Sequence, residues 1–293
     1  MSARELSGRP LAIRLMAEAG RRAAAVTRRR GRAPRLAIVA ASDAAAGSYL
    51  KIKLRACASS GVETVVHRLS PGPRAKTLGL LADLCGDPGV DAILIETPYP
   101  RGVSLADASA VIPSDKDAEG ITPSVYGRLF LAKSWKEARE LVVPCTAMSI
   151  ARLALASKAP LAGRHALVIG RSATVGRPAA HLLSTLDMTV TLAHSRTKGL
   201  AALCREADLL VLAAGVPGLV KPTWIKRGAV VLDAGVHLVR GHLVGDAAPG
   251  ADKRAGILTP VPGGVGPVTT ACAVLNAVLL AERRSALLPI RRG

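Results

Sequence analysis

Aromatic residues are scarce in this sequence: Phe, Trp and Tyr together make up 2% of the 293 residues. Proteins that bind single-stranded nucleic acid stack bases on aromatic side chains, so this scarcity argues against that class. Acidic residues are also few, 21 against 40 Lys and Arg, which leaves a formal net charge of +19 at pH 7. The excess is mostly arginine spread along the chain, which is typical of solvated surfaces and suits polyanionic small ligands. We therefore expect no nucleic-acid partner.

Signatures of metal sites, disulfide frameworks and membrane spans are also missing. The five cysteines stand far apart without a C-x-x-C pair, which indicates reduced, mostly buried thiols. The six histidines form no H-x-x-x-H pair, and His237 with His242 has the wrong spacing for ligation, so we expect no metal. Apolar runs such as Ala207–Val216 are too short or interrupted for a membrane helix of about 20 residues. Without a signal-peptide pattern we expect a cytoplasmic protein without a membrane partner, although the acid-free Arg21–Arg35 leaves a transit peptide as an alternative.

Apolar runs alternate with helical patterns along the chain, which predicts an α/β protein with parallel sheets. The length and a hydrophobic content of 49% suffice for two domains. In the N-terminal half we expect helices over 8–27, 48–60 and 76–85 and strands over 36–41, 64–69 and 92–96. In the C-terminal half we expect helices over 144–157, 175–186 and 199–204, strands at 167–169, 189–193, 209–213, 229–233 and 257, and a last helix to about 281.

The stretch Leu167–Pro178 has the layout of a dinucleotide-binding turn. Three apolar residues run into Gly170, and Gly176 follows where a helix begins. A helix N-terminus offers unpaired N–H groups and a partial positive charge to a pyrophosphate. The positions of a G-x-G-x-x-G motif hold Gly170, Ser172 and Val175, so these residues alone also suit an ordinary strand–turn–helix.

The next strand leads into Ser195 and Arg196, where an NAD-specific site would carry an acidic residue for the ribose hydroxyls. Serine and arginine instead suit a 2′-phosphate. We therefore predict NADP as the cofactor, the alternative being a surface arginine of a basic chain.

Candidate site residues also follow the N-terminal strands. Tyr49 and Lys53 are four residues apart and share one helical face near a strand's carboxyl end, where α/β proteins bind ligands. Glu96 ends the third strand before a stiff, proline-rich loop. The charged segment 112–120, which includes Glu119, is either a solvated turn or a functional loop.

Near the C-terminus, Thr259–Thr269 contains three prolines and three glycines. This composition predicts a rigid loop whose backbone groups are accessible to a ligand.

Five of these motifs stand in the order typical of one enzyme family. They are Tyr49-x-x-x-Lys53, Lys116–Gly120, Pro144-Cys145-Thr146, Gly170-Arg171-Ser172 with Val175-Gly176, and Thr259–Thr269. The chain resembles the bifunctional methylenetetrahydrofolate dehydrogenase/methenyltetrahydrofolate cyclohydrolase family from Leu6 to the last helix. The resemblance implies a folate-binding domain over 1–142, completed by 270–293, and a Rossmann-like NADP-binding domain over 143–269. It also implies a cytoplasmic or organellar homodimer in one-carbon metabolism.

The resemblance further implies roles for single residues. Tyr49 stacks on the folate rings, Lys53 is the key residue of the cyclohydrolase step, Glu96 belongs to the same catalytic group, and Glu119 holds the pterin. The expected cofactor contacts are Gly170, Arg171, Ser172, Val175, Gly176, Ser195 and Arg196, and the expected substrate contacts of the closing loop are Pro262, Gly263 and Gly264.

This sequence departs from the family pattern at several positions. The family usually has glutamine at Glu96 and aspartate at Glu119. It also differs at Ala46, at Ala147–Ser149 and at Ser124–Tyr126. If Glu96 reaches Lys53, the carboxylate raises the pKa of the ammonium, so we expect impaired hydrolysis beside retained dehydrogenase activity. The alternatives are a non-catalytic pterin- or NADP-binding paralogue with a regulatory role, or a related enzyme acting on another pterin-like substrate.

Overall fold

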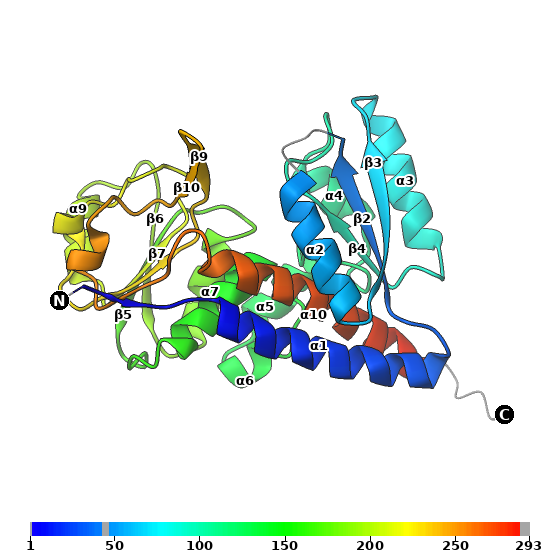
Figure 1. Ribbon diagram of the computed structural model, residues 1–293, viewed down its shortest axis with the longest axis horizontal. Helices are drawn as coiled ribbons and strands as arrows, with labels where there is room; N and C mark the ends of the chain where they lie inside the picture. The colour runs from blue at the N-terminus through cyan, green and yellow to red at the C-terminus, as the bar shows by residue number, and fades with distance from the viewer. Residues whose placement is uncertain (1, 43–46, 288–293) are drawn as a thin grey trace. The chain divides into compact units, whose positions relative to one another are not determined.

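The computed structural model describes residues 2–42 and 47–287, which form two compact units (Figure 1). Unit 1 contains Met1–Ala12 and Gly127–Thr269, and unit 2 contains Ile13–Tyr126 and Thr270–Gly293. The division falls inside three helices, α1 (Arg9–Arg30), α5 (Pro123–Leu131) and α10 (Val265–Leu287). Each unit therefore combines segments from both ends of the chain.

Unit 2 is built on a three-stranded parallel sheet of order β3-β2-β4. The central strand β2 is almost entirely buried and apolar, as a strand covered on both faces must be, whereas the edge strand β3 is partly exposed. Leu81 and Leu84 of α3 and Ala108 of α4 pack against one face of the sheet. The elements are β2 (Arg35–Ala41), α2 (Gly47–Ser59), β3 (Glu63–Leu69), α3 (Arg74–Gly86), β4 (Ala92–Ile95) and α4 (Leu105–Val111).

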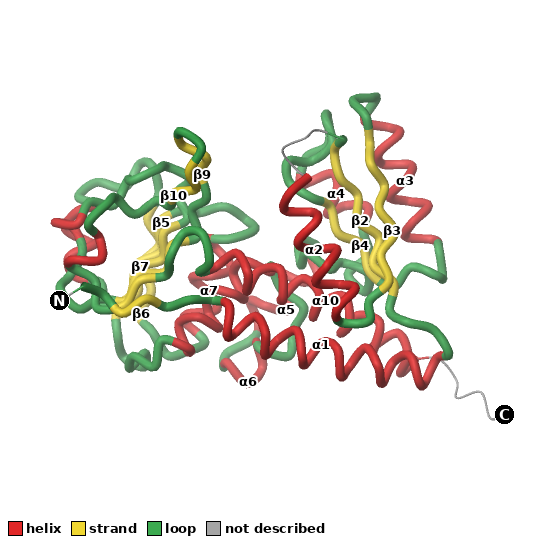
Figure 2. The backbone as a smooth tube through the Cα atoms, viewed as in Figure 1, coloured by secondary structure: helices red, strands yellow, loops and turns green. Residues whose placement is uncertain are grey.

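Unit 1 is built on a six-stranded parallel sheet of order β1-β11-β8-β7-β5-β6 (Figure 2). From β5 the chain first adds β6 on one side and then crosses to add β7 on the other, so β5 and β7 flank a topological switch point. The sheet strands are β1 (Arg4–Glu5), β5 (His165–Ile169), β6 (Thr189–Ala193), β7 (Leu209–Leu212), β8 (Val230–Asp233) and β11 (Ile257–Leu258). The other elements are α6 (Trp135–Ala138), α7 (Cys145–Ala156), α8 (Gly176–Ser184), α9 (Leu200–Glu206), the hairpin of β9 (His237–Val239) and β10 (His242–Val244), and 3-10 turns at Pro222–Trp224 and Ala251–Lys253. The α/β class and the parallel sheets are confirmed.

The last helix differs from the sequence expectations in two respects. First, α10 begins at Val265, so the final five residues of the Thr259–Thr269 segment are helical rather than loop. Pro267 is tolerated there because the first turn of a helix has no partner for its N–H groups. Second, Val265–Ala286 is by length and composition apolar enough to span a membrane, although 72% of its 18-residue apolar window is buried inside the structure. A core helix has the same composition, because its apolar residues face neighbouring elements all round.

The five cysteines are free thiols, as expected, and four of them are buried. Cys85 is partly exposed.

Candidate functional site

Helix α2 buries a lysine on its inner face. Lys53 is 5% exposed and shares this face with the fully buried Leu50 and Cys57. Its partner is Glu96, 6% exposed, which directly follows β4 and whose backbone N–H donates to the Val39 carbonyl at 2.8 Å. The Lys53 ammonium donates a hydrogen bond to a Glu96 carboxylate oxygen. The fold thus brings together two of the site residues that were predicted from the sequence.

The charge state of Lys53 follows from these neighbours. Burial alone would lower the pKa of Lys53, but the carboxylates of Glu96 and Glu119 outweigh burial and raise it above its ordinary value. The Lys53 Nζ atom also lies 5.6 Å from the ring centroid of Tyr49, whose side chain is 41% exposed. A buried ion pair is thus bordered by an aromatic face that reaches solvent.

The charged segment 112–120 is not a solvated turn at its centre. Lys116 is 2% exposed and donates to the carbonyls of Leu84 and Asp87, and Asp117 is fully buried. The Asp117 carboxylate accepts from the N–H groups of Gly120 and Thr122, both at 2.8 Å. These bonds hold the segment beside β4 and fix the backbone around Glu119.

The carboxyl of Glu119 has a pKa that is raised to near neutrality. Burial raises its pKa to about 7, Lys53 opposes this, and Glu96 and Asp117 reinforce it. The remaining tyrosines of the chain, Tyr99 and Tyr126, have pKa values raised to about 12 by burial and by the nearby charge of Glu119 and Asp117.

Tyr99 was not predicted as a site residue, and Tyr126 was noted only as part of the departure at Ser124–Tyr126. The structure places Tyr126 in the first turns of α5. The scarcity of tyrosine was the available signal, because all three tyrosines of the chain lie within electrostatic reach of Glu119.

In unit 1 the glycines after β5 allow three backbone segments to meet. Gly170 has φ +125°, and a Cβ there would lie 2.0 Å from the Ala213 carbonyl oxygen, just after β7. A Cβ on Gly176, the first residue of α8, would lie 1.8 Å from the Gly170 carbonyl oxygen. A side chain at either position would separate the turn from β7 or from α8. This close packing at a switch point is a feature of dinucleotide-binding folds.

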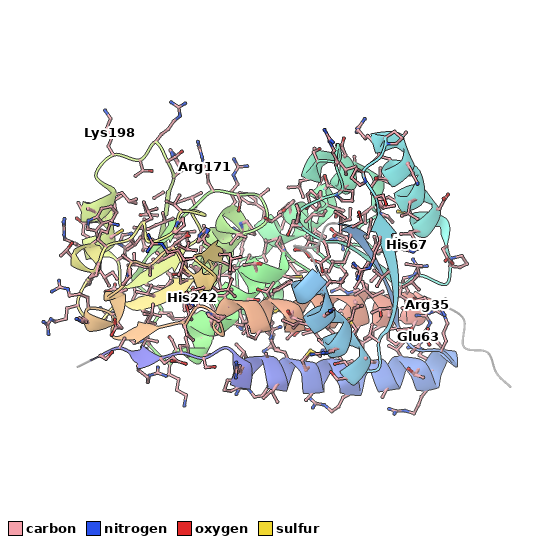
Figure 3. All side chains as sticks on the ribbon, turned by 45° about the horizontal axis from the view of Figure 1, so that its top comes forward. Arg35, Glu63, His67, Arg171, Lys198 and His242 are labelled. Atoms are coloured by element: carbon pink, nitrogen blue, oxygen red, sulfur yellow. The ribbon has the colours of Figure 1, made fainter. Side chains whose placement is uncertain are left out.

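The neighbouring turns carry exposed polar and cationic groups. The Ser172 hydroxyl accepts from the N–H groups of Val175 and Gly176 at 3.2 and 3.4 Å, at the start of α8. Arg171 follows β5, and Ser195 and Arg196 form the turn after β6, all exposed. Because β5 and β6 are adjacent, both turns lie at the same edge of the sheet, where Arg171 and Lys198 project outward (Figure 3). These residues fit a phosphorylated dinucleotide, because they combine a helix N-terminus with positive charge.

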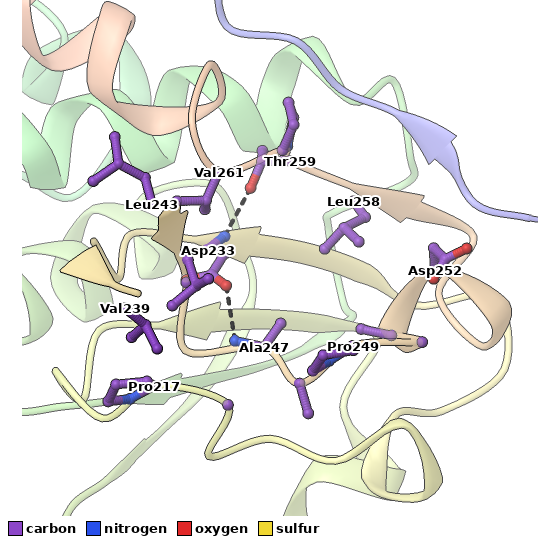
Figure 4. A pocket seen from close by; sticks show the side chains of 17 residues that line it. Pro217, Asp233, Val239, Leu243, Ala247, Pro249, Asp252, Leu258, Thr259 and Val261 are labelled. Atoms are coloured by element: carbon purple, nitrogen blue, oxygen red, sulfur yellow. Dashed lines mark hydrogen bonds between the residues drawn. The ribbon is translucent and has the colours of Figure 1, made fainter. Parts of the chain in front are cut away.

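The loop 259–264 is tied to the start of the chain. Gly8 donates its N–H to the Gly263 carbonyl at 2.9 Å, and a Cβ on Gly8 would lie 1.9 Å from the Gly264 carbonyl oxygen. The preceding residues Pro260 and Val261 line a pocket of about 470 Å³ (Figure 4). Its lining is drawn from residues 217–261, so the Gly170 turn lies outside it.

Two buried aspartates that sequence analysis did not single out organise the same sheet edge. Asp233, at the end of β8, accepts from the N–H groups of Gly235 and Ala247, and its own N–H donates to the Thr259 hydroxyl (Figure 4). Asp246 is fully buried as well. The sequence signal for Asp233 was an acidic residue as the last residue of an apolar strand.

The predicted catalytic residues Tyr49, Lys53 and Glu96 lie in unit 2 with Glu119. The predicted cofactor residues lie in unit 1, as do Pro262, Gly263 and Gly264. The departure at Ala46 falls outside the described residues. The one at Ala147–Ser149 lies in α7, where the Ser149 hydroxyl donates to the Cys145 carbonyl at 2.7 Å.

Most of the chain matches a known family. The tetrahydrofolate dehydrogenase/cyclohydrolase catalytic-domain model matches residues 6–119, and the NAD(P)-binding domain model of the same family matches 144–285. The bifunctional protein FolD of Acidiphilium cryptum is 40% identical over 97% of this chain and 100% of its own length. The bifunctional protein FolD of a Parafrankia species is 42% identical over 85% of this chain and 88% of its own length.

Solved structures agree over the same length. The bifunctional FolD enzyme from Campylobacter jejuni has a TM-score of 0.88 and 31% identity, covering 97% of this chain and 100% of that one. The methylenetetrahydrofolate dehydrogenase-cyclohydrolase of Trypanosoma brucei, complexed with NADP and an inhibitor, has a TM-score of 0.88 and 32% identity, covering 98% and 100%. From its fold, its two polar sites and these relatives, the chain belongs to the tetrahydrofolate dehydrogenase/cyclohydrolase family.

Proposed function

We propose that this protein is a methylenetetrahydrofolate dehydrogenase, an oxidoreductase that converts 5,10-methylenetetrahydrofolate to 5,10-methenyltetrahydrofolate with NADP. The observation that carries the proposal is the match to bifunctional relatives along both units of the chain. The alternatives of a non-catalytic paralogue and of an enzyme for another pterin gain no support from these relatives.

The residues of unit 2 suit a folate that becomes a cation. Oxidation turns the neutral methylene bridge into a positively charged amidinium, and NADP supplies the hydride acceptor when bound. An unpaired Lys53 ammonium would oppose this developing charge. The Glu96 carboxylate balances the charge of the Lys53 ammonium, so the ion pair presents no net charge to the substrate. We assign Tyr49 to stacking on the folate rings and Glu119 to the pterin.

The same pair disfavours hydrolysis of the methenyl product. Hydrolysis adds water, and a base must take the proton that water loses. A neutral lysine could act as that base, but Glu96 stabilises the ammonium and raises the pKa of Lys53. We therefore propose that the hydrolase activity, which would yield 10-formyltetrahydrofolate and make the enzyme multifunctional, is impaired.

For NADP we assign the pyrophosphate to the turn Gly170–Gly176 and the 2′-phosphate to Arg171, Ser195 and Arg196. The exposed cations after β5 and β6 support this assignment. We assign Pro262–Gly264 to the closing of the substrate site. We also propose residues 1–142 with 270–293 as the folate-binding domain and 143–269 as the NADP domain. The start of the NAD(P)-binding family model at residue 144 supports the first boundary, and the grouping of Thr270–Gly293 with Ile13–Tyr126 supports the C-terminal completion of the folate-binding domain.

We further propose a cytoplasmic homodimer that binds neither nucleic acid nor membranes. The dimer rests on the resemblance alone, and light scattering of the purified protein tests it: a mass of one chain would contradict it.

One assay tests the activity. Purified protein receives methylenetetrahydrofolate and NADP, and NADPH and the methenyl product are followed in the same cuvette. We expect NADPH formation with accumulation of the methenyl product, since its hydrolysis is slow. Tight NADP binding without NADPH formation would contradict the dehydrogenase and favour the non-catalytic paralogue. Equal use of NAD and NADP would contradict the assignments of Arg171 and Ser195.

A further inference from the structure

The carboxylate of Asp246 joins four donors at the carboxyl edge of the unit 1 sheet. One oxygen accepts from the N–H groups of Ala214 and Gly215 at 2.7 and 3.0 Å. The other accepts from the Val216 N–H at 3.1 Å and from His237 Nε2 at 2.7 Å. A carboxylate has about four lone-pair positions, so these donors saturate it.

Three consecutive N–H groups converging on one carboxylate fix the backbone conformation of Ala214–Val216. Asp246 is fully buried, and Gly215 and Val216 are exposed on the other side of the loop. These N–H groups are already engaged, so the loop can offer a ligand its shape and its exposed side but not these three donors. Gly235 leaves room for the arrangement, because a Cβ there would lie 2.3 Å from Asp246 Oδ1.

The clamped loop lies at the topological switch point of the sheet. It follows β7, next to the Gly170 turn that follows β5, and a Cβ on Gly170 would lie 2.0 Å from the Ala213 carbonyl oxygen. Ligands of open α/β sheets bind outside the strand ends at such a point. A shift of Ala214–Val216 would therefore change the shape of the nucleotide site that we propose at this point.

His237 is the only side chain among the four donors, and its side chain is 19% exposed. It extends from β9, so it also links the hairpin to the loop after β7. Without it, one Asp246 oxygen loses a donor in a site where water has little access. The carboxylate can then rotate away from the three N–H groups.

We propose that His237 is a positioning residue of the nucleotide site, which acts through Asp246 to hold the Ala214–Val216 loop in its binding conformation. This inference rests on the proposed use of NADP. His237 touches neither folate nor the reacting atoms in this role.

The test compares wild type with His237→Ala, His237→Gln and His242→Ala. His242 provides the matched control, because it is an exposed histidine of the same hairpin (Figure 3). NADP and tetrahydrofolate dissociation constants are measured by titration, and amide hydrogen exchange of residues 214–216 is measured without ligand. We expect His237→Ala to weaken NADP about tenfold and to speed exchange of the three amides about tenfold, as for the loss of a hydrogen bond to a charged group. We expect the dissociation constant of tetrahydrofolate to change by less than about twofold, because distant substitutions have small effects.

Glutamine at 237 can still donate to Asp246, so it should restore most of the NADP affinity, and His242→Ala should match wild type. Unchanged NADP affinity and unchanged amide exchange in His237→Ala would overturn the proposal. An equal loss of affinity for NADP and tetrahydrofolate would also overturn it, because it would indicate general destabilisation. A wild-type protein that binds no NADP would instead overturn the proposed function, and the exchange experiment would still decide whether His237 holds the loop.

Discussion

Lys53 and Glu96 form a hydrogen-bonded ion pair in which both side chains are at least 93% buried, on α2 and at the end of β4. Transferring either charge from water is costly, and each is tolerated because the other is present. The pair therefore has two separable consequences, one for stability and one for the protonation of Lys53.

Removing the lysine alone should destabilise the protein strongly. Lys53→Met leaves the Glu96 carboxylate buried without its cation, and we expect a loss of about 3–5 kcal/mol in the free energy of unfolding. The double variant Lys53→Met/Glu96→Gln should recover most of this loss, because no buried charge remains. Urea unfolding of the single and double variants measures the coupling. The control is Glu63→Gln, which breaks the exposed Arg35–Glu63 pair (Figure 3) and should cost at most about 1 kcal/mol.

Neutralising Glu96 alone should exchange one activity for the other. In Glu96→Gln the ammonium of Lys53 loses its partner, so its pKa falls and a neutral amine becomes accessible. If the pKa of Lys53 falls by roughly one unit, the fraction of neutral amine at pH 8 rises about tenfold, and we expect methenyltetrahydrofolate hydrolysis to rise by the same factor. Oxidation of methylenetetrahydrofolate should slow. A variant with unchanged hydrolysis would show that Glu96 does not restrain Lys53.

Glu119 should make stability depend on pH near neutrality. Its pKa is raised from 4.5 to about 7 in the folded protein, so the folded state binds this proton more tightly than the unfolded state does. The resulting stabilisation is complete below pH 4.5 and is lost as the pH rises through about 7. The Tm of wild type relative to Glu119→Gln should therefore fall between pH 5 and pH 8. A constant difference in Tm across this range would contradict the raised pKa.

Two glycine substitutions should have opposite effects. Gly176→Ala places a Cβ 1.8 Å from the Gly170 carbonyl oxygen, so α8 must move away from the turn. We expect a loss of at least about 2 kcal/mol, as for other overpacked sites, together with weaker NADP binding. Gly79→Ala, within α3, meets nothing within 4 Å and should stabilise by about 0.5–1 kcal/mol through helix propensity. Thermal unfolding and NADP titration of both variants check the contrast.

The choice between NADP and NAD should depend on Arg196. Arg196→Ala removes an exposed cation from the turn after β6, and we expect the KM for NADP to rise about tenfold, as for the loss of a charge-assisted hydrogen bond, with the KM for NAD unchanged. Arg227→Ala is the control, since Arg227 is exposed before β8, at the opposite edge of the sheet. Parallel increases in both KM values would exclude recognition of the 2′-phosphate by Arg196.

Local patterns predicted most of the strands, the long helices and the shared face of Tyr49 and Lys53, because these depend on neighbours within a few residues. The short strands β1, β9 and β10 were not predicted. The contact between Lys53 and Glu96 could be predicted only conditionally, because it requires β2 and β4 to be adjacent. This adjacency depends on the pairing of strands that are distant in sequence. The burial of Asp117 depends on a bridge to Ile93 of β4 that has no periodic signal. The His237–Asp246 bond was missed because it links a short hairpin to a loop.

The pairing of β1 with β11 also bears on the order in which the protein can be completed. Arg4 pairs with Ile257, so β1 is synthesised long before β11, the strand with which it pairs. Contacts so distant in sequence form late, because the intervening chain must first be ordered. Until residues 257–258 emerge, the edge of β8 that β11 will occupy stays open to other strands in the nascent chain or its neighbours. The strand β1 thus closes unit 1 only after residues 257–258 have been synthesised.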